Sequence, residues 1–120
     1  MARILIVDDD PIVLDLVRDL LTMQGHSVGS AVDGAQALAK LGAEAFDLLV
    51  IDRNMPVMDG VAAVTALRRD PRLAALKVLM FTSAAEPEAR EQALRAGVNG
   101  FLRKPIQMAE FTATIKAALA

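Results

Sequence analysis

The chain has 120 residues, a formal net charge of −2, 54% hydrophobic residues and no cysteine. This length and apolar content fit one folded domain with its own core, which we expect over residues 1–120, and argue against disorder. The lack of cysteine excludes disulfides, thiolate catalysis and zinc–thiolate sites. Aromatic residues make up 3% and the largest basic clusters are pairs, so direct nucleic-acid binding is not expected.

The N-terminus leads directly into a short apolar run at 4–7. Such a run is too short for the core of a signal peptide or for a membrane span. We therefore expect a cytoplasmic protein that does not contact a membrane.

The predicted elements begin with a strand at 4–7, which is apolar throughout and therefore suits burial on both faces of a sheet. Asp10-Pro11 predicts the start of a helix, with aspartate as the cap, and Gly25 predicts its end. A weaker strand at 27–31 suits an edge of the sheet. The apolar stripe of the first helix consists of Val13, Leu16, Val17, Leu20 and Leu21.

The alternation of strands and helices continues to the end of the chain. Asp33-Gly34 opens a second helix, and a buried strand is predicted at 48–51. A third helix is expected to end at Pro71, and a third buried strand lies at 78–81. The next helix begins with acids at 86–88, where the helix dipole favours them. Its apolar positions and its terminal glycine are Ala89, Ala93, Leu94 and Gly97.

A short strand at 100–102 and a helix with apolar residues at Phe111, Ile115 and Leu119 complete the chain. A strand followed by a helix thus occurs five times. This pattern predicts an α/β fold of the doubly wound (βα)5 type, in which helices cover both faces of a parallel sheet and the crossovers are right-handed.

Reactive or polar residues follow the predicted strands. The first strand ends in Asp8, Asp9 and Asp10, the second buried strand in Asp52, and the third in Thr82 and Ser83, while the last leads to Lys104. The carboxyl ends of parallel strands lie at one edge of the sheet, where ligands bind. We therefore expect these side chains to converge: Asp8, Asp9, Asp52, Thr82 and Lys104.

Three carboxylates at one place repel each other unless one keeps a proton or a cation lies among them. Oxygen ligands without histidine or cysteine favour a hard ion, so Mg²⁺ is expected, with Mn²⁺ as a substitute. A cation there would make one carboxylate a usable nucleophile toward a phosphoryl group. Lys104 and the Thr82 hydroxyl would then stabilise the other phosphoryl oxygens.

Four segments together resemble the receiver domains of two-component response regulators, the family of the chemotaxis regulator. They read ILIVDD at 4–9, LVIDRNMPVMDG at 49–60, FTSA at 81–84 and GFLRKP at 100–105. They span nearly the whole chain in the expected order. The resemblance implies a flavodoxin-like fold with five parallel strands in the order 2-1-3-4-5.

The same resemblance implies roles for the acidic residues. Asp52 would accept the phosphoryl group and also bind Mg²⁺. Asp9 would bind Mg²⁺ directly, Asp8 through water, and Asn54 through its backbone carbonyl. No other cofactor is implied.

For the other matching residues, the resemblance implies contact of Thr82 and Lys104 with the phosphoryl group and a cis peptide bond between Lys104 and Pro105. Phe101 would be the switch aromatic that moves inward with Thr82. The chemotaxis regulator has tyrosine at that position, so a partner that reads its hydroxyl is not expected here. Ile106 stands where phenylalanine is frequent, without evident cost. Asn54 and Ala84 occupy positions that tune loss of the phosphoryl group.

The implied function is acceptance of a phosphoryl group from a phosphohistidine of a sensor kinase or phosphotransfer protein. Phosphorylation would change the surface around the fourth helix, fifth strand and fifth helix, which would be read by a downstream protein that the sequence does not identify. The chain would catalyse only its own phosphorylation and dephosphorylation. We expect a stand-alone regulator, and the alternative is a receiver domain from a longer regulator or hybrid kinase.

Two other functions are less consistent with the residues. A phosphohydrolase of the haloacid-dehalogenase type would need an acid two residues after the nucleophile, where Asn54 stands. A flavin carrier of the same fold would need a phosphate loop after the first strand, where three aspartates would repel phosphate. Asp10 is interpreted as a helix cap, Asp59 with Gly60 as a turn and helix start, and His26 as a surface residue.

Overall fold

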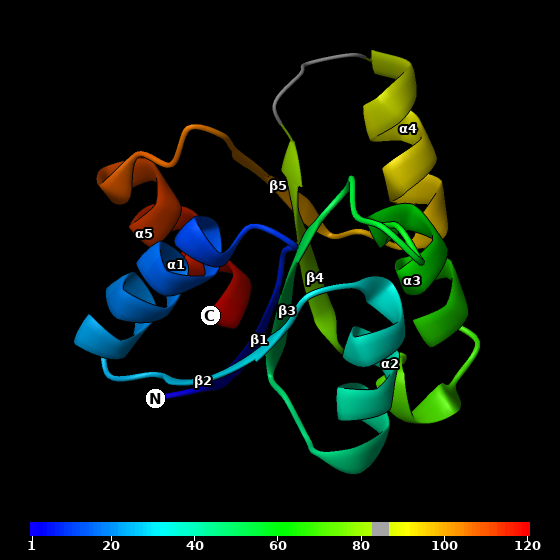
Figure 1. Cartoon of the computed structure of the whole chain (residues 1–120), viewed down its shortest axis with the longest axis horizontal. Coiled ribbons are helices and arrows are strands. Elements are labelled where there is room, and N and C mark those ends of the chain that lie inside the picture. The colour runs from blue at the N-terminus through cyan, green and yellow to red at the C-terminus, as the bar shows by residue number, and fades with distance from the viewer. Residues whose placement is uncertain (83–86) are drawn as a thin grey trace.

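The computed structural model describes residues 1–82 and 87–120, so the interpretations of Ser83 and Ala84 concern positions outside the described residues. Within these residues a parallel sheet has the strand order β2-β1-β3-β4-β5 (Figure 1). The order and the parallel pairing confirm the predicted flavodoxin-like fold. The strands are β1 (Arg3–Val7), β2 (Ser27–Ala31), β3 (Leu48–Asp52), β4 (Lys77–Thr82) and β5 (Gly100–Arg103).

The helices cover both faces of the sheet. Figure 1 shows α1 and α5 on one side and α2, α3 and α4 on the other. Their bounds are α1 (Pro11–Met23), α2 (Gly34–Ala43), α3 (Gly60–Leu67), α4 (Pro87–Ala96) and α5 (Met108–Leu119), with a short 3-10 helix, η1 (Pro71–Leu73), before β4. No helix in the described part of the chain is long and apolar enough to cross a membrane.

The two helical layers explain why the strands are apolar without alternation. Leu5 and Leu49 face the layer of α2, α3 and α4, whereas their neighbours Ile4 and Leu48 face α1 and α5. Successive side chains of a strand point to opposite faces of the sheet. Both faces of the central strands are therefore buried, and each strand contributes to two hydrophobic clusters.

Aspartates cap three of the helices, at the positions where the sequence predicted a helix to begin. The side chains of Asp10, Asp33 and Asp59 accept hydrogen bonds from backbone N–H groups in the first turns of α1, α2 and α3. Gly25 and Gly97 follow α1 and α4 with φ of 88° and 116°, the left-handed conformation that ends many helices.

The third helix ends at Leu67, so the prediction that it reaches Pro71 was wrong. Pro71 begins η1, and the Asp70 side chain accepts a hydrogen bond from the Arg72 N–H. Asp70-Pro71 is thus a start signal of the same kind as Asp10-Pro11, an aspartate cap with proline in the first turn.

Two residues assigned to apolar stripes are not in the core. Leu16 is 45% exposed and Leu94 is 52% exposed, while Leu14 and Ala93 are buried. Leu16 lies two positions from buried Leu14, and Leu94 lies one position from buried Ala93, so neither leucine shares the face of its buried neighbour.

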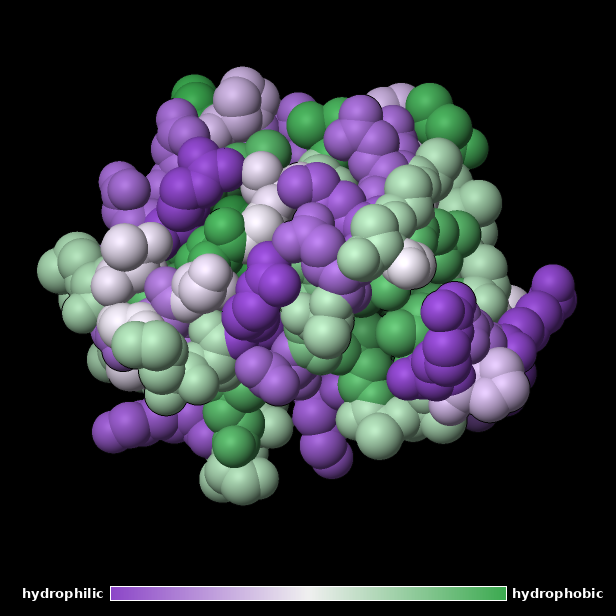
Figure 2. Space-filling view, turned by 90° about the horizontal axis from the view of Figure 1, so that it is seen from below, coloured by the Kyte–Doolittle hydropathy of each residue, from purple (hydrophilic) through white to green (hydrophobic). Residues whose placement is uncertain are grey.

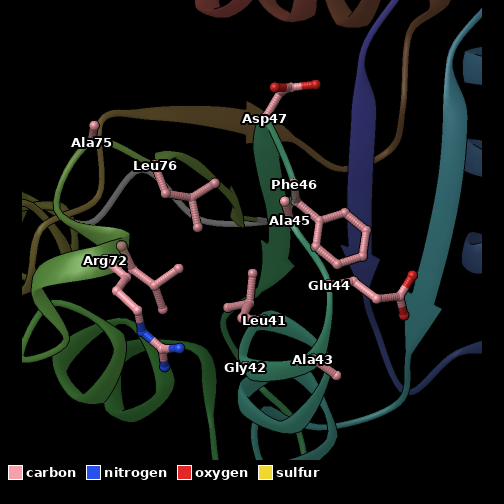
Figure 3. A pocket seen from close by; sticks show the side chains of 11 residues that line it. Leu41, Gly42, Ala43, Glu44, Ala45, Phe46, Asp47, Arg72, Ala75 and Leu76 are labelled. Atoms are coloured by element: carbon pink, nitrogen blue, oxygen red, sulfur yellow. The ribbon is translucent and has the colours of Figure 1, made fainter.

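The amino edge of the sheet is opposite the predicted site. Hydrophilic and hydrophobic residues are interspersed on this side of the molecule (Figure 2). A hollow lies there between α2 and the segments before β3 and β4, and Leu41 and Leu76 point into it (Figure 3). Two charged residues of its lining are paired, Glu44 with Arg3 and Arg72 with Asp70.

Candidate functional site

The carboxyl edge of the sheet brings together residues that are far apart in the sequence. Asp8 follows β1, Asp52 ends β3, and Lys104 follows β5. Because β1 and β3 are adjacent and Val7 pairs with Ile51, Asp8 and Asp52 lie side by side at this edge. This is the upper edge of the sheet in Figure 1.

Three carboxylates form a cluster there. Asp8, Asp9 and Asp52 each offer an oxygen, and these oxygens lie within 4.8 Å of one another. Asp8 is 2% exposed and Asp52 is 9% exposed, whereas Asp9 is open to solvent. The cluster is thus a partly buried oxygen site that is open on the side of Asp9.

The ammonium of Lys104 lies between the two buried carboxylates. Its Nζ is 2.8 Å from Oδ2 of Asp8 and 3.3 Å from Oδ1 of Asp52. A single positive charge therefore faces two buried negative charges, and Asp9 adds a third carboxylate nearby. The site retains an excess of negative charge at neutral pH.

Burial raises the pKa of Asp52, and the negative charge of Asp8 raises it further. The charge and hydrogen bond of Lys104 and the backbone N–H of Arg53 act in the opposite direction without cancelling the rise. Burial by itself lowers the pKa of Lys104, but its hydrogen bond to Asp8 and the two carboxylate charges outweigh burial, so this pKa is raised. Lys104 is thus held in the charged form.

The donor set fits a hard divalent cation. All three side chains offer carboxylate oxygens, and the charge of Lys104 neutralises only part of theirs. Mg²⁺ prefers a few carboxylate ligands together with water molecules and phosphate oxygens. Asp8, Asp9 and Asp52 could therefore hold this ion, with the open side at Asp9 left for water or a phosphoryl group.

Hydrogen bonds of the backbone fix the two buried carboxylates. The Asp10 N–H donates to Oδ1 of Asp8 over 2.9 Å, and the Arg53 N–H donates to Oδ1 of Asp52 over 3.0 Å. The Asp10 side chain caps α1, as expected. A Cβ at Gly60 would collide with the Asp52 carbonyl oxygen, so only glycine allows this close approach of α3 to β3.

Of the three other predicted site residues, Thr82 lies at the same edge of the sheet, whereas Asn54 and Phe101 are placed only by the elements that hold them. Asp52 pairs with Phe81 across the sheet, so Thr82, the half-buried last residue of β4, lies one residue further toward the same edge. Asn54 is exposed in the loop between β3 and α3. Phe101 is half-buried in β5, and the guanidinium carbon of Arg90 lies 4.7 Å from its ring centre.

The peptide bond between Lys104 and Pro105 is cis, which confirms that expectation. His26 is partly buried and lines a surface pocket, and its Nδ1 accepts a hydrogen bond from the Ala2 N–H. It follows Gly25, whose left-handed conformation turns the chain back toward β1.

Sequence reasoning missed Arg53. Its side chain donates to two residues of α4, the Ala89 carbonyl and the Gln92 amide oxygen. The available signal was its position directly after Asp52, which does not indicate where the side chain lies.

The chain matches the family model "Response regulator receiver domain" over residues 4–116, and it belongs to this family. It is 42% identical over 104 residues to the chemotaxis protein CheY of Pseudomonas aeruginosa, with 86% of this chain and 84% of CheY covered. It is 39% identical over 119 residues to RpaA of Synechocystis, a "DNA-binding dual master transcriptional regulator", with 99% of this chain covered. The chain spans 49% of the length of RpaA and of the PrrA regulators that it also matches.

Solved structures share the fold over the whole chain. The chemotaxis response regulator CheY4 of Vibrio cholerae has a TM-score of 0.95 and 34% identity, and the match covers 99% of both chains. The receiver domain of sensor histidine kinase PA1611 of Pseudomonas aeruginosa, described "with magnesium ion coordinated in the active site cleft", has a TM-score of 0.90 and 28% identity. That match covers 98% of this chain and 97% of the other.

Proposed function

We propose that residues 1–120 form a phosphoacceptor domain in which Asp52 takes a phosphoryl group from a phosphohistidine of a kinase or phosphotransfer protein. The observation that carries this proposal is the pairing of buried Asp52 with Lys104 beside two further carboxylates. Phosphoryl transfer requires mainly in-line positioning and stabilisation of charge, and such a site provides both. Membership of the receiver family supports the same conclusion.

In the proposed reaction a carboxylate oxygen of Asp52 attacks the phosphorus atom. A new P–O bond forms, the P–N bond to the imidazole breaks, and the imidazole nitrogen leaves with the electron pair. Lys104 neutralises one phosphoryl oxygen, and Thr82 donates a hydrogen bond to another. Attack of water on phosphorus later restores the Asp52 carboxylate and releases inorganic phosphate.

Asp8, Asp9 and Asp52, with the backbone carbonyl of Asn54, would hold Mg²⁺. When bound, this ion neutralises negative charge of the carboxylates and of the phosphoryl oxygens. The PA1611 receiver domain was solved with magnesium in its active site cleft, which supports the assignment. Asp9 is the exposed member of the cluster, so it is the residue through which the ion would enter.

The output would pass through the surface of α4, β5 and α5 to a protein partner. Thr82 ends β4, which lies between β3 and β5 in the sheet, and Phe101 lies in β5, which is part of that surface. We propose that Thr82 and Phe101 move together on phosphorylation and change this surface. The domain would catalyse its own modification and act on no small substrate.

The test is incubation of the protein with acetyl phosphate and Mg²⁺, followed by intact-mass measurement. We expect the mass of one phosphoryl group on the wild-type chain and on an Asp10→Asn variant, which keeps a capping side chain next to the cluster. We expect no added mass on an Asp52→Asn variant or when EDTA replaces Mg²⁺. Equal labelling of the Asp52→Asn variant would contradict the proposal.

A further inference from the structure

Arg53 connects the loop after β3 with helix α4. Its Nη1 lies 3.0 Å from the Ala89 carbonyl oxygen, and its Nη2 lies 2.6 Å from Oε1 of Gln92. Its own backbone is fixed as well, because its N–H donates to Asp52 and its carbonyl accepts from the Gly60 N–H over 2.9 Å. One residue thus contacts the proposed phosphoacceptor through its backbone and α4 through its side chain.

Helix α4 has little apolar anchoring of its own. Ala93 is its buried residue among those described, and Leu94 is half exposed to solvent. Elements with few buried contacts shift at low cost in free energy. Polar contacts such as those of Arg53 therefore contribute a large share of what holds α4 in place.

The partners of Arg53 on α4 are neutral. No carboxylate forms an ion pair with its guanidinium among residues 1–82 and 87–120. The Arg53 N–H donates to Oδ1 of Asp52, so a phosphoryl group on this carboxylate would alter the bond that fixes the Arg53 backbone and, with it, the position of the side chain. Arg53 lines a surface hollow together with residues of α4, among them Glu88, Glu91 and Arg95, so the guanidinium has room to change its partner.

We propose that Arg53 is a positioning residue that holds α4 in its unphosphorylated place, and that its hydrogen bonds to Ala89 and Gln92 weaken when Asp52 carries a phosphoryl group. This inference rests on the proposed function of Asp52. A contact present only in the unphosphorylated conformation stabilises that conformation. The change to the phosphorylated conformation becomes less favourable by the same free energy. Removal of the contact should therefore favour the phosphorylated form.

The test is titration of the protein with beryllofluoride, a phosphoryl analogue, in the presence of Mg²⁺. An Arg53→Met variant, which keeps the aliphatic part of the side chain, should bind beryllofluoride about fivefold more tightly than wild type. A Gln92→Glu variant should bind about threefold more weakly, because a charge-assisted pair strengthens the contact to Arg53. In the double variant the effect of Gln92→Glu should disappear.

An Arg95→Met variant is the matched control, because Arg95 lines the same hollow but pairs with Glu91 on its own helix. Its affinity should equal that of wild type. A Gln92→Ala variant removes one contact and leaves Arg53 in place, so it tests the inference if Arg53→Met does not fold. In NMR spectra without ligand, Arg53→Met should shift the amide signals of α4 toward their beryllofluoride-bound positions.

Unchanged or weaker beryllofluoride binding by Arg53→Met would overturn the inference. It would also be overturned if Gln92→Glu changed the affinity equally in the wild-type chain and in the Arg53→Met variant. Failure of the proposed function has a different signature. In that case the wild-type protein would not bind beryllofluoride at all, and the inference about Arg53 would fall with it.

Discussion

The ammonium of Lys104 donates a hydrogen bond to the carboxylate of Asp8 over 2.8 Å, although 96 residues of sequence separate the two. Asp8 is buried, and its other oxygen accepts a hydrogen bond from the Asp10 backbone. Lys104 also lies 3.3 Å from Asp52. This one cation therefore ties the end of β5 to the ends of β1 and β3, and it makes the acidic cluster tolerable in the folded state.

Replacement of Lys104 by methionine should destabilise the protein. Asp8 and Asp52 would then share a buried site with no cation, and loss of a hydrogen bond to a charged group costs about 2 kcal/mol. Urea denaturation without divalent ions would measure this loss. A Lys116→Met variant, in which an exposed lysine of α5 is changed, should keep the wild-type value. Equal stability of both variants would show that the pairing contributes nothing.

Replacement of Asp52 by asparagine should stabilise the protein at neutral pH. The pKa of Asp52 is raised in the folded state, chiefly by burial, so the folded chain holds this proton more tightly than the unfolded chain does. The stabilisation from this group is complete below the ordinary pKa of an aspartate. It is lost as the pH rises through the raised value.

At neutral pH the asparagine variant should therefore be more stable than wild type, because it carries no charge that burial and Asp8 disfavour. The advantage should vanish in acid, where Asp52 is protonated. Denaturation at a series of pH values without Mg²⁺ measures both. An asparagine variant less stable than wild type at neutral pH would mean that the ion pair with Lys104 outweighs burial.

Mg²⁺ should stabilise the wild-type protein through the acidic cluster. A ligand that binds only the folded state at ten times its dissociation constant adds about 1.4 kcal/mol. Asp9 is exposed and forms no ion pair with any described residue, so Asp9→Asn should not lower the stability without metal, since it removes one of three clustered charges, and it should abolish the gain. Thermal unfolding with Mg²⁺ or EDTA gives the comparison. A gain retained in Asp9→Asn would place the ion elsewhere.

Replacement of Val57 by glycine should stabilise the loop between β3 and α3. Val57 has φ of 69° and is 85% exposed, so its branched side chain sits in a left-handed conformation without compensating burial. Such strain costs on the order of 1 kcal/mol, which glycine would relieve in part. Val32→Gly is the control, because Val32 is exposed but lacks this conformation, and it should destabilise. Destabilisation by Val57→Gly would show that the strain is absent.

Much of the fold and the cluster could be predicted from the sequence because both depend on local patterns and on one topological rule. The apolar run at 48–51 indicated a strand buried on both faces, and Asp52 follows it directly. Once the sheet is parallel, Asp8, Asp52 and Lys104 have to meet at one edge. The caps at Asp10 and Asp59 were predictable for a similar reason, since a cap acts within a few residues of the backbone groups it satisfies.

The contacts of Arg53 could not be predicted in this way. They depend on how α4 packs against α3 and the sheet, which no local pattern specifies. The same limit explains Leu16 and Leu94, whose burial depends on the rotation of each helix on the sheet. Pro71 was misassigned because a proline that cannot continue one helix also favours the first turn of another. The roles of Thr82 and Phe101 stay predictions, because they concern a phosphorylated state.

The most direct measurement is chemical identification of the residue that receives the phosphoryl group. After treatment with acetyl phosphate and Mg²⁺, borohydride reduction converts an aspartyl phosphate to homoserine, which peptide mass spectrometry locates in the chain. The account predicts homoserine at position 52 and unmodified Asp8, Asp9 and Asp10. Homoserine at one of those three positions, or an intact Asp52 in protein that carries phosphate, would contradict it.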